Sequence, residues 1–212
     1  MKTLLIKNLP KGWNKERLAL YGKCIRGVSY APKDLRSSGD PASVTLLRSN
    51  NIKNDKLNLL DLQVVSTNKV SEEQLLKHGD IFICMSNGSK ALVGKNVFIE
   101  DDLNYTVGAF CSIFRFDHTR IYPLFVKQLF LSEEYRKQIA DSLAGTSINN
   151  LKNSHIEDLE FLIPPYEEQK KISEALSLVD LKKQTHEEVI LKIDKLKKGL
   201  MSDLLSGKVR AK

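Results

Sequence analysis

The feature that most constrains this chain is the absence of proline and glycine between Pro165 and Gly199. Proline and glycine are the residues that interrupt helices most strongly. The stretch therefore predicts one long helix that continues to Ser206, roughly 60 Å long at about 1.5 Å per residue. A domain of this size cannot cover such a helix, so part of it is expected to project and to pair with another helix.

Within this helix, one set of residues recurs at alternating steps of three and four, which is the heptad spacing of a coiled-coil seam. The predicted dimer seam consists of Ile172, Ala175, Val179, Lys182, His186, Val189, Ile193, Leu196 and Leu200. Lys182 and His186 are polar seam positions near its middle. Two interpretations stay open for them: a flexible, hydrated point in the seam, or polar residues that fix register and orientation.

The helix carries more apolar residues than one seam needs, and Leu178, Leu181 and Ile190 lie outside it. A stripe this wide predicts a second contact surface. The alternative is that these residues pack against the N-terminal part of the same chain.

The residues before Pro164 show short apolar runs that are interrupted by Gly, Asn, Ser and Pro. This pattern is typical of a mixed α/β domain with short elements. We expect a first domain over residues 1–163, a long helix over 164–207 and a basic tail over 208–212. The expected helices are 14–24 and 123–143, and the expected strands are 44–47, 63–66, 80–85, 107–116 and 158–163.

Composition narrows the functional classes. The formal net charge of +7 excludes an acidic disordered protein and permits a nucleic-acid partner. No run of eighteen apolar residues and no signal-peptide pattern occurs, so we expect a cytoplasmic protein without a membrane span. Cys24, Cys84 and Cys111 are isolated, and the histidines show no ligand spacing, so no metal site is predicted.

No enzyme signature is present: the sequence lacks a P-loop, a dinucleotide-binding glycine motif and a nucleophile elbow. The segment Ile163-Pro164-Pro165-Tyr166 resembles the catalytic motif of DNA amino-methyltransferases. Its first position is Ile163, which cannot accept the hydrogen bond that this chemistry requires. The two prolines instead fit a strand exit and the start of a helix. We therefore predict no catalytic residue in this chain.

Four polar loops, at residues 33–38, 48–56, 86–90 and 146–150, are candidates for nucleic-acid contacts. Asn pairs with adenine and Arg or Lys with guanine, while Ser, Thr and Lys suit phosphates. Ordinary turn formation explains the Asn and Gly positions equally well.

Several segments, taken in order, resemble the specificity (S) subunit of Type I restriction–modification systems. They are Leu9-Pro10-Lys11-Gly12-Trp13, Ile25-Arg26-Gly27, Leu47-Arg48-Ser49-Asn50-Asn51-Ile52, Gly79-Asp80-Ile81 with Met85-Ser86-Asn87-Gly88-Ser89-Lys90 and Val93-Gly94-Lys95, Gly145-Thr146-Ser147-Ile148-Asn149-Asn150-Leu151, Ile163-Pro164-Pro165-Tyr166-Glu167-Glu168-Gln169-Lys170-Lys171-Ile172, and Leu204-Leu205-Ser206-Gly207-Lys208-Val209-Arg210. No single motif is highly specific, but the ordered set covers nearly the whole chain.

The resemblance implies a non-catalytic reader of double-stranded DNA: a mixed α/β target-recognition domain followed by a coiled-coil helix. It implies a separate modification subunit that methylates adenine with adenosylmethionine, and a restriction subunit that uses ATP and Mg²⁺. This chain itself would hold no cofactor, and Leu178, Leu181 and Ile190 would dock the modification subunit. The alternatives are a coiled-coil adaptor without DNA binding and the S subunit of a related fused restriction–methylation enzyme.

Family members usually carry two recognition domains and two helices, whereas this sequence shows one of each. The resemblance therefore predicts a half-length form that works as an antiparallel homodimer, reading a palindromic, bipartite site. The competing arrangement pairs the chain with a different S half. Expected base contacts are Arg48, Asn50, Asn51, Asn87 and Lys90, and expected phosphate contacts are Lys33, Arg36, Lys53, Ser89, Thr146 and Ser147.

Overall fold

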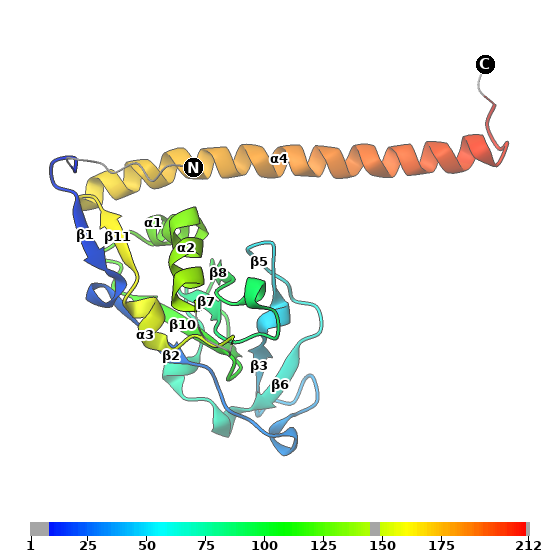
Figure 1. Cartoon of the computed structure of the whole chain (residues 1–212). Helices are drawn as coiled ribbons and strands as arrows, with labels where there is room; N and C mark the ends of the chain where they lie inside the picture. The colour runs from blue at the N-terminus through cyan, green and yellow to red at the C-terminus, as the bar shows by residue number, and fades with distance from the viewer. Residues whose placement is uncertain (1–8, 145–148, 211–212) are drawn as a thin grey trace. The chain divides into compact units, whose positions relative to one another are not determined.

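The computed structural model describes residues 9–144 and 149–210 (Figure 1). Its internal contacts divide the chain into a first unit, Met1–Lys170, and a second unit, Lys171–Lys212. The first unit is a mixed sheet-and-helix domain, and the second unit continues one long helix. This confirms the predicted fold class, a mixed α/β domain followed by a long C-terminal helix.

The first unit is built from short strands in four small sheets. Its strands are β1 (Asn14–Arg17), β2 (Gly22–Arg26), β3 (Ser43–Leu47), β4 (Ile52–Lys53), β5 (Lys56–Leu57), β6 (Gln63–Ser66), β7 (Ile81–Cys84), β8 (Asn96–Phe98), β9 (Tyr105–Val107), β10 (Cys111–Phe116) and β11 (Glu160–Ile163). The sheet orders are β1-β11, β2-β10-β7-β8, β6-β3-β9 and β4-β5. All pairs are antiparallel except β3 with β9, which is parallel.

Helices and single turns cover and connect these sheets. The α-helices of the first unit are α1 (Pro123–Leu131), α2 (Glu133–Ser142) and α3 (Asn153–Glu157), and its 3-10 turns are η1 (Leu18–Leu20), η2 (Pro32–Asp34), η3 (Ser49–Asn51), η4 (Thr67–Lys69), η5 (Glu72–Gln74) and η6 (Lys90–Leu92). The central strand β7 is buried along its whole length. Its neighbour β10 is buried at every position except Arg115. This apolar core is what the β-rich sequence runs predicted.

The predicted helix over 14–24 is wrong, because this segment forms β1, η1 and β2. Strand β1 pairs with β11 in a register that places Asn14 opposite Ile163 and Arg17 opposite Glu160. Across this pair Lys15 and Arg17 meet the carboxylate of Glu160. These contacts, made with a segment far away in the sequence, override the local helix propensity.

Two other elements are divided where the sequence suggested continuity. The run 107–116 forms β9 and β10 with a turn at residues 108–110 between them. The predicted helix over 123–143 is interrupted at Ser132, whose backbone is extended and whose side chain accepts a hydrogen bond from the Tyr135 N–H. Ser132 thus caps the N-terminus of α2.

The helix α4 (Tyr166–Leu205) runs from the end of the first unit through most of the second. Gln169 helps to place its first turn, accepting a hydrogen bond from the Tyr122 N–H and donating one to the Pro164 carbonyl. The predicted long helix is therefore confirmed. Among the described residues, no helix has the length and apolar character needed to cross a membrane.

Candidate nucleic-acid interface

The turn after β3 is held together by Asn51, which is fully buried. Its side-chain oxygen accepts a hydrogen bond from the Arg48 N–H (2.8 Å), and its amide nitrogen donates to the carbonyls of Asn58 (2.9 Å) and Leu60 (3.0 Å). These bonds use the amide to shape the loop. Because the Asn51 side chain is buried and bonded within its own loop, we do not retain the predicted base contact for this residue.

Arg48 and Asn50, on the same turn, both bond to Asp61. The Asp61 carboxylate lies 2.8 Å from Arg48 Nη2 and 2.9 Å from Asn50 Nδ2. Asp61 has a φ of +56°, a conformation that is uncommon for a residue other than glycine. The shared acidic partner fixes the orientation of two predicted base-contacting side chains.

The loop after β7 adjoins this turn. Asn87 Nδ2 lies 3.4 Å from Ser49 Oγ, and Asn87 Oδ1 accepts a hydrogen bond from the Ser89 N–H at 3.0 Å. The same loop meets Asn149, whose side-chain nitrogen donates to the Gly88 carbonyl at 3.0 Å. Parts of three loops that were predicted separately, at residues 48–56, 86–90 and 146–150, thus lie together. Thr146 and Ser147 lie outside the described residues.

A fourth segment, which the sequence reasoning missed, joins this cluster. In the turn between β9 and β10, the Phe110 carbonyl accepts hydrogen bonds from the N–H groups of Met85 (2.9 Å) and Ser86 (3.1 Å). The side chain of Phe110 is nevertheless 72% exposed. Gly108 inside a strand-like run was the signal that could have indicated a break there.

Two of these segments, the turn after β3 and the turn between β9 and β10, line a cavity of about 760 Å³, which is a volume typical of ligand sites. It is lined by Ser29, Tyr30, Arg48, Ser49, Asn50, Gly108, Ala109, Phe110 and Cys111. The lining therefore combines two aromatic rings with a guanidinium, an amide and several hydroxyls. Such a combination can bond to polar atoms and cover apolar ones at the same time. We call this the β3–β9 cavity.

Burial raises the pKa of the Cys111 thiol well above its ordinary value, and the neighbouring Cys84 adds to the effect. Burial also raises the pKa of Cys84. Both thiols are therefore protonated at neutral pH and poor nucleophiles. Among residues 9–144 and 149–210, no group of His, Cys, Asp and Glu has the arrangement of a metal site.

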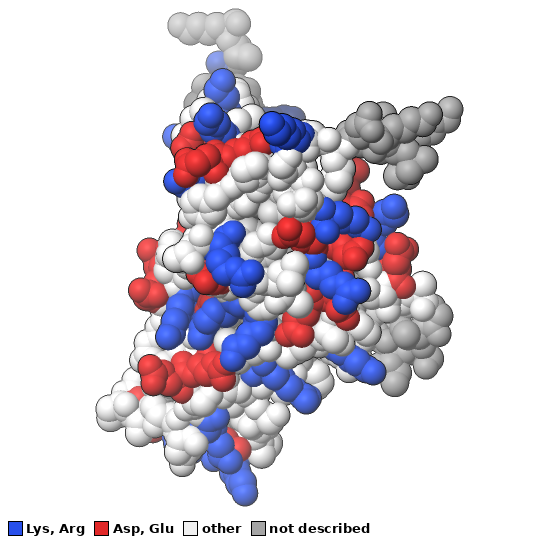
Figure 2. All heavy atoms as spheres, turned by 90° about the vertical axis from the view of Figure 1, so that its left-hand side faces the viewer, with Lys and Arg blue, Asp and Glu red and all other residues white. Residues whose placement is uncertain are grey.

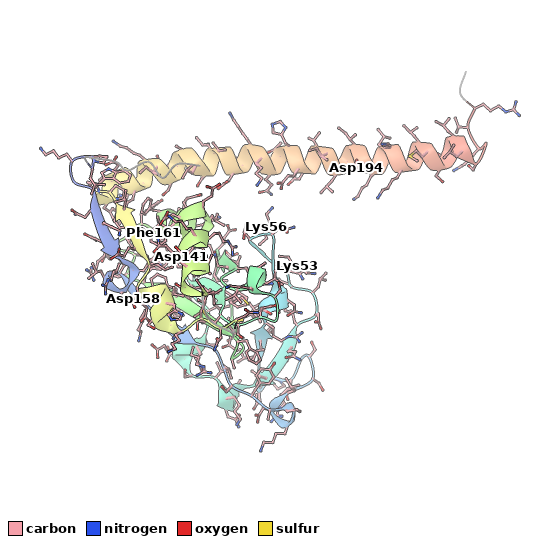
Figure 3. The ribbon with its side chains drawn as sticks, in the orientation of Figure 1. Lys53, Lys56, Asp141, Asp158, Phe161 and Asp194 are labelled. Atoms are coloured by element: carbon pink, nitrogen blue, oxygen red, sulfur yellow. The ribbon has the colours of Figure 1, made fainter. Side chains whose placement is uncertain are left out.

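The remaining predicted contacts lie outside the β3–β9 cavity. Lys53 and Lys56 lie on the β4–β5 hairpin (Figure 3), and both are exposed. Lys33 and Arg36 are also exposed, and Arg36 Nη1 donates to the carbonyls of Lys33 and Leu35. Lys90 Nζ donates to the Leu143 carbonyl at 2.8 Å, so part of its hydrogen-bonding capacity is already used within the fold.

The face of the first unit that carries β1 and β11 has a different character. Figure 2 shows basic and acidic side chains intermingled over it. The ion pairs of Lys15 with Glu160 and of Arg17 with Asp158 contribute to this mixture. A face with balanced charge has little attraction for a phosphate backbone.

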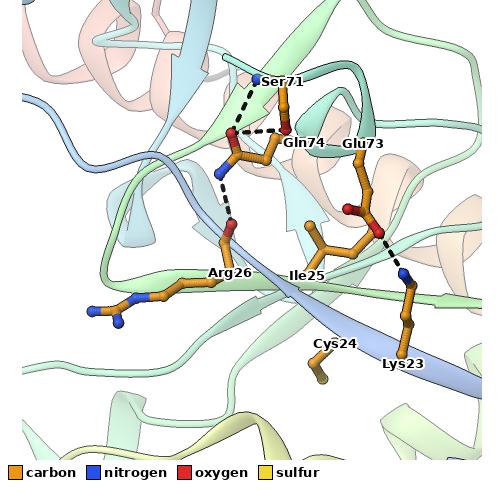
Figure 4. A pocket seen from close by; sticks show the side chains of 7 residues that line it. All are labelled: Lys23, Cys24, Ile25, Arg26, Ser71, Glu73 and Gln74. Atoms are coloured by element: carbon orange, nitrogen blue, oxygen red, sulfur yellow. Dashed lines mark hydrogen bonds and ion pairs between the residues drawn. The ribbon is translucent and has the colours of Figure 1, made fainter. Parts of the chain in front are cut away.

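A second hollow, of about 410 Å³, lies between β2 and η5 (Figure 4). Lys23 pairs with Glu73, and that contact holds the pKa of Glu73 below its usual value. Gln74 donates to the Arg26 carbonyl and accepts from the Ser71 N–H. These polar groups bond to one another and join the two elements, which fits a structural contact.

The proposed contact surfaces of α4 are exposed in the second unit. Of the predicted seam, Val179, Val189, Ile193, Leu196 and Leu200 are exposed apolar residues, and Lys182 and His186 are exposed polar ones. The docking residues Leu178, Leu181 and Ile190 are exposed as well. Ala175 is exposed, and Ile172 is half-buried.

The sequence of this chain is similar to those of known DNA specificity subunits. The protein-family model described as "Type I restriction modification DNA specificity domain" matches residues 11–195. The Type I restriction enzyme EcoKI specificity subunit of Escherichia coli K12 is 32% identical over 208 residues, covering 96% of this chain and 45% of that protein. The StySPI specificity subunit of Salmonella potsdam is 32% identical over 203 residues, covering 94% and 44%. The chain thus spans about half the length of these relatives.

Solved structures show the same fold. The HsdS subunit from Thermoanaerobacter tengcongensis superposes with a TM-score of 0.62 at 16% identity, covering 91% of this chain and 48% of that one. A chain from a study of complex assembly and conformational transition of the type I R-M system gives a TM-score of 0.66 at 15% identity, with coverages of 95% and 47%.

Proposed function

This chain belongs to the Type I restriction–modification DNA specificity family, and from that premise we propose that it binds duplex DNA and selects the sequence on which its partner subunits act. The match of the family model across residues 11–195 carries this proposal. The convergence of the loops at 48–51, 86–89 and 149–150 supports it, because sequence readout requires several side chains at one surface.

We assign base contacts to Arg48, Asn50, Asn87 and Lys90, all in the turns that follow β3 and β7. Their amide and cationic groups match adenine and guanine edges in the major groove. We assign phosphate contacts to Lys33, Arg36, Lys53 and Ser89, which are exposed. Thr146 and Ser147 are added because their hydroxyl groups suit phosphates.

Chemistry is proposed to reside in partner subunits. A modification subunit would methylate adenine with adenosylmethionine, and a restriction subunit would cleave DNA with ATP and Mg²⁺. This chain would bind none of these cofactors and would catalyse no step. Purified chain incubated with DNA and all three cofactors should then leave the DNA unmethylated and uncut.

The seam of α4 is proposed to join two copies of this chain in antiparallel pairing. Its support is the exposed apolar row that includes Val189, Ile193 and Leu196, which a monomer would leave in water. Antiparallel pairing about a two-fold axis is self-complementary and ends at a dimer. The site read by such a dimer would be palindromic and bipartite. Light scattering should report twice the 24.0 kDa chain mass at tens of micromolar.

Leu178, Leu181 and Ile190 are proposed to dock the modification subunit. Changing all three to Asp should abolish co-purification while the first unit stays folded. The matched control is Lys198→Asp, which also makes a large negative charge change, but elsewhere on α4. Co-purification that survives the triple change would contradict this assignment.

The proposed function is tested by sequencing the methylome of cells that carry this chain with its modification partner. One methylated motif with two like halves is the expected result. In vitro, affinity for duplex carrying that motif should fall steeply as salt rises. A coiled-coil adaptor, the rival from another class, would give no motif and no salt-dependent binding. Unlike half-sites would contradict the homodimer alone.

A further inference from the structure

The exposed ring of Phe110 has no role in the fold described above. With 72% of its surface exposed, it contributes little to the core. Single exposed apolar residues are common on protein surfaces, so exposure alone carries no function. What distinguishes Phe110 is a hydrogen-bonded backbone beneath the ring and a cavity beside it that also contains hydrogen-bonding side chains.

The backbone of the turn at residues 108–110 is held from three sides. Val28 donates from its N–H to the Val107 carbonyl at 2.7 Å, and Gly108 donates to the Leu47 carbonyl at 2.9 Å. Met85 and Ser86 both donate to the carbonyl of Phe110 itself. The chain also passes so closely here that a Cβ on Gly27 would lie 2.2 Å from the Gly108 carbonyl oxygen. The turn therefore presents Phe110 from a fixed position.

Beside the ring, the β3–β9 cavity brings hydrogen-bonding groups next to an apolar surface. Asn50 Nδ2 carries two hydrogens, and its bond to Asp61 uses one. Ser49 adds a hydroxyl, and Arg48 adds a guanidinium whose orientation Asp61 fixes. A donor next to an apolar ring is the complement of an acceptor next to a methyl group.

Among the base pairs of DNA, thymine alone presents that combination in the major groove, with its O4 acceptor next to the C5 methyl. Cytosine shows an amino donor at the same place and no methyl. We infer that Phe110 is a specificity-determining residue that covers the C5 methyl of one thymine while the polar side chains around the β3–β9 cavity bond to the base edges. This inference rests on the proposed function and deepens it by naming the base.

The test combines a protein change with a single-methyl change in the DNA. Once the methylome gives the motif, each thymine of one half-site is replaced by deoxyuridine, which removes only the C5 methyl. With unmodified Phe110, one replacement should weaken binding about fourfold, the value of one buried methyl-sized group. Phe110→Ala should weaken binding to the intact site about tenfold and abolish the sensitivity to that replacement.

Two further variants separate this contact from a general effect. Phe110→Leu keeps an apolar side chain and should retain part of the deoxyuridine sensitivity. Leu20→Ala removes another exposed apolar side chain, on η1, and should bind both DNAs as the unchanged chain does.

Three results would overturn the inference. One is a motif that stays unchanged in Phe110→Ala, and another is deoxyuridine sensitivity that persists in that variant. The third is a uniform loss of affinity without relaxation at any position, which would indicate a ring wedged between base pairs. Each leaves the proposed function standing, because the unchanged chain would still bind its motif. If the unchanged chain binds no motif at all, the proposed function itself fails.

Discussion

The two units of this chain differ in how far their side chains find partners within the same unit. In the first unit, even the polar residues of the loops bond to neighbours in the same unit, as Asn51 and Asp61 show. Along α4 from Leu178 to Leu200, apolar side chains are exposed instead. The polar groups of the first unit therefore find their partners within that unit, while α4 leaves a row of apolar side chains uncovered in its own unit. Substitutions in the first unit should therefore alter the free energy of unfolding more than comparable substitutions on α4.

The largest difference is expected between two ion pairs. Asp80 is buried and accepts hydrogen bonds from Arg115 Nε (2.9 Å) and Nη2 (2.7 Å). Asp80→Asn leaves this guanidinium without its counter-charge and should lower the free energy of unfolding by about 3 kcal/mol. Glu187→Gln removes the exposed pair with Lys183 on α4 and should change it by less than about 0.5 kcal/mol.

Both values come from urea unfolding. The fluorescence of Trp13, the single tryptophan and a residue of the first unit, reports on Asp80→Asn. Circular dichroism of the helical signal reports on Glu187→Gln. If both variants lost the same small amount of stability, the ion pair of the first unit would be no more important for folding than the ion pair on α4.

The next comparison is between two adjacent asparagines. Asn51→Ala removes the partners of the Arg48 N–H and of the Asn58 and Leu60 carbonyls, and should cost about 2 kcal/mol of stability. Asn50→Ala, at an exposed site, should stay within about 0.5 kcal/mol and alter DNA affinity alone. Thermal unfolding and DNA titration of both variants check this. If Asn51→Ala had the stability of the unchanged chain, the loop would not depend on Asn51, and the predicted base contact of this residue would stand again.

These two asparagines show what sequence reasoning could not supply. Their side chains are identical, and their difference arises from the carbonyls of Asn58 and Leu60, which chain folding brings to Asn51. The same limit explains β1, whose partner β11 lies at the other end of the first unit. By contrast, α4 could be predicted because helix breakers and heptad spacing are local properties.

Phe110 illustrates a different failure of prediction. An apolar residue in a β-rich run looks like a core residue, and only the turn at residues 108–110 places its ring outside. The polar loops at 48–51 and 86–89 were predictable as loops from their turn-forming residues. That they lie beside each other depends on β3 and β7 belonging to neighbouring sheets, which no local pattern reveals.

A smaller effect is expected from two hydroxyls. Ser132 caps α2, so Ser132→Ala should destabilise the first unit by about 1 kcal/mol. Thr185 lies within α4, where its hydroxyl donates to the Leu181 carbonyl one turn earlier. Thr185→Ala should raise the stability of the helix by a few tenths of a kcal/mol, since alanine has the higher helix propensity. Circular dichroism during heating measures both, and a destabilised Thr185→Ala would indicate that a partner uses this hydroxyl.

The smallest effect is expected from pH. Partial burial and the nearby His78 ring, 6.3 Å away between centroids, lower the pKa of His118 below its usual 6.5, against the opposing charges of Asp80 and Asp117. Between pH 6.5 and that lowered pKa, the unfolded chain binds more protons at this position than the folded chain does. The contribution of His118 to the free energy of unfolding is thus complete above pH 6.5 and declines as the pH falls through this window. Because the ring is partly exposed, solvent screening should keep this loss of stability within a few tenths of a kcal/mol.

Urea unfolding followed through Trp13 fluorescence at pH 7.5 and 5.5 should show this loss, and His118→Gln should reduce the difference in stability between the two pH values. His186→Gln, on α4, is the matched control and should leave the Trp13 transition unchanged; an equal reduction there would show that the two units unfold together.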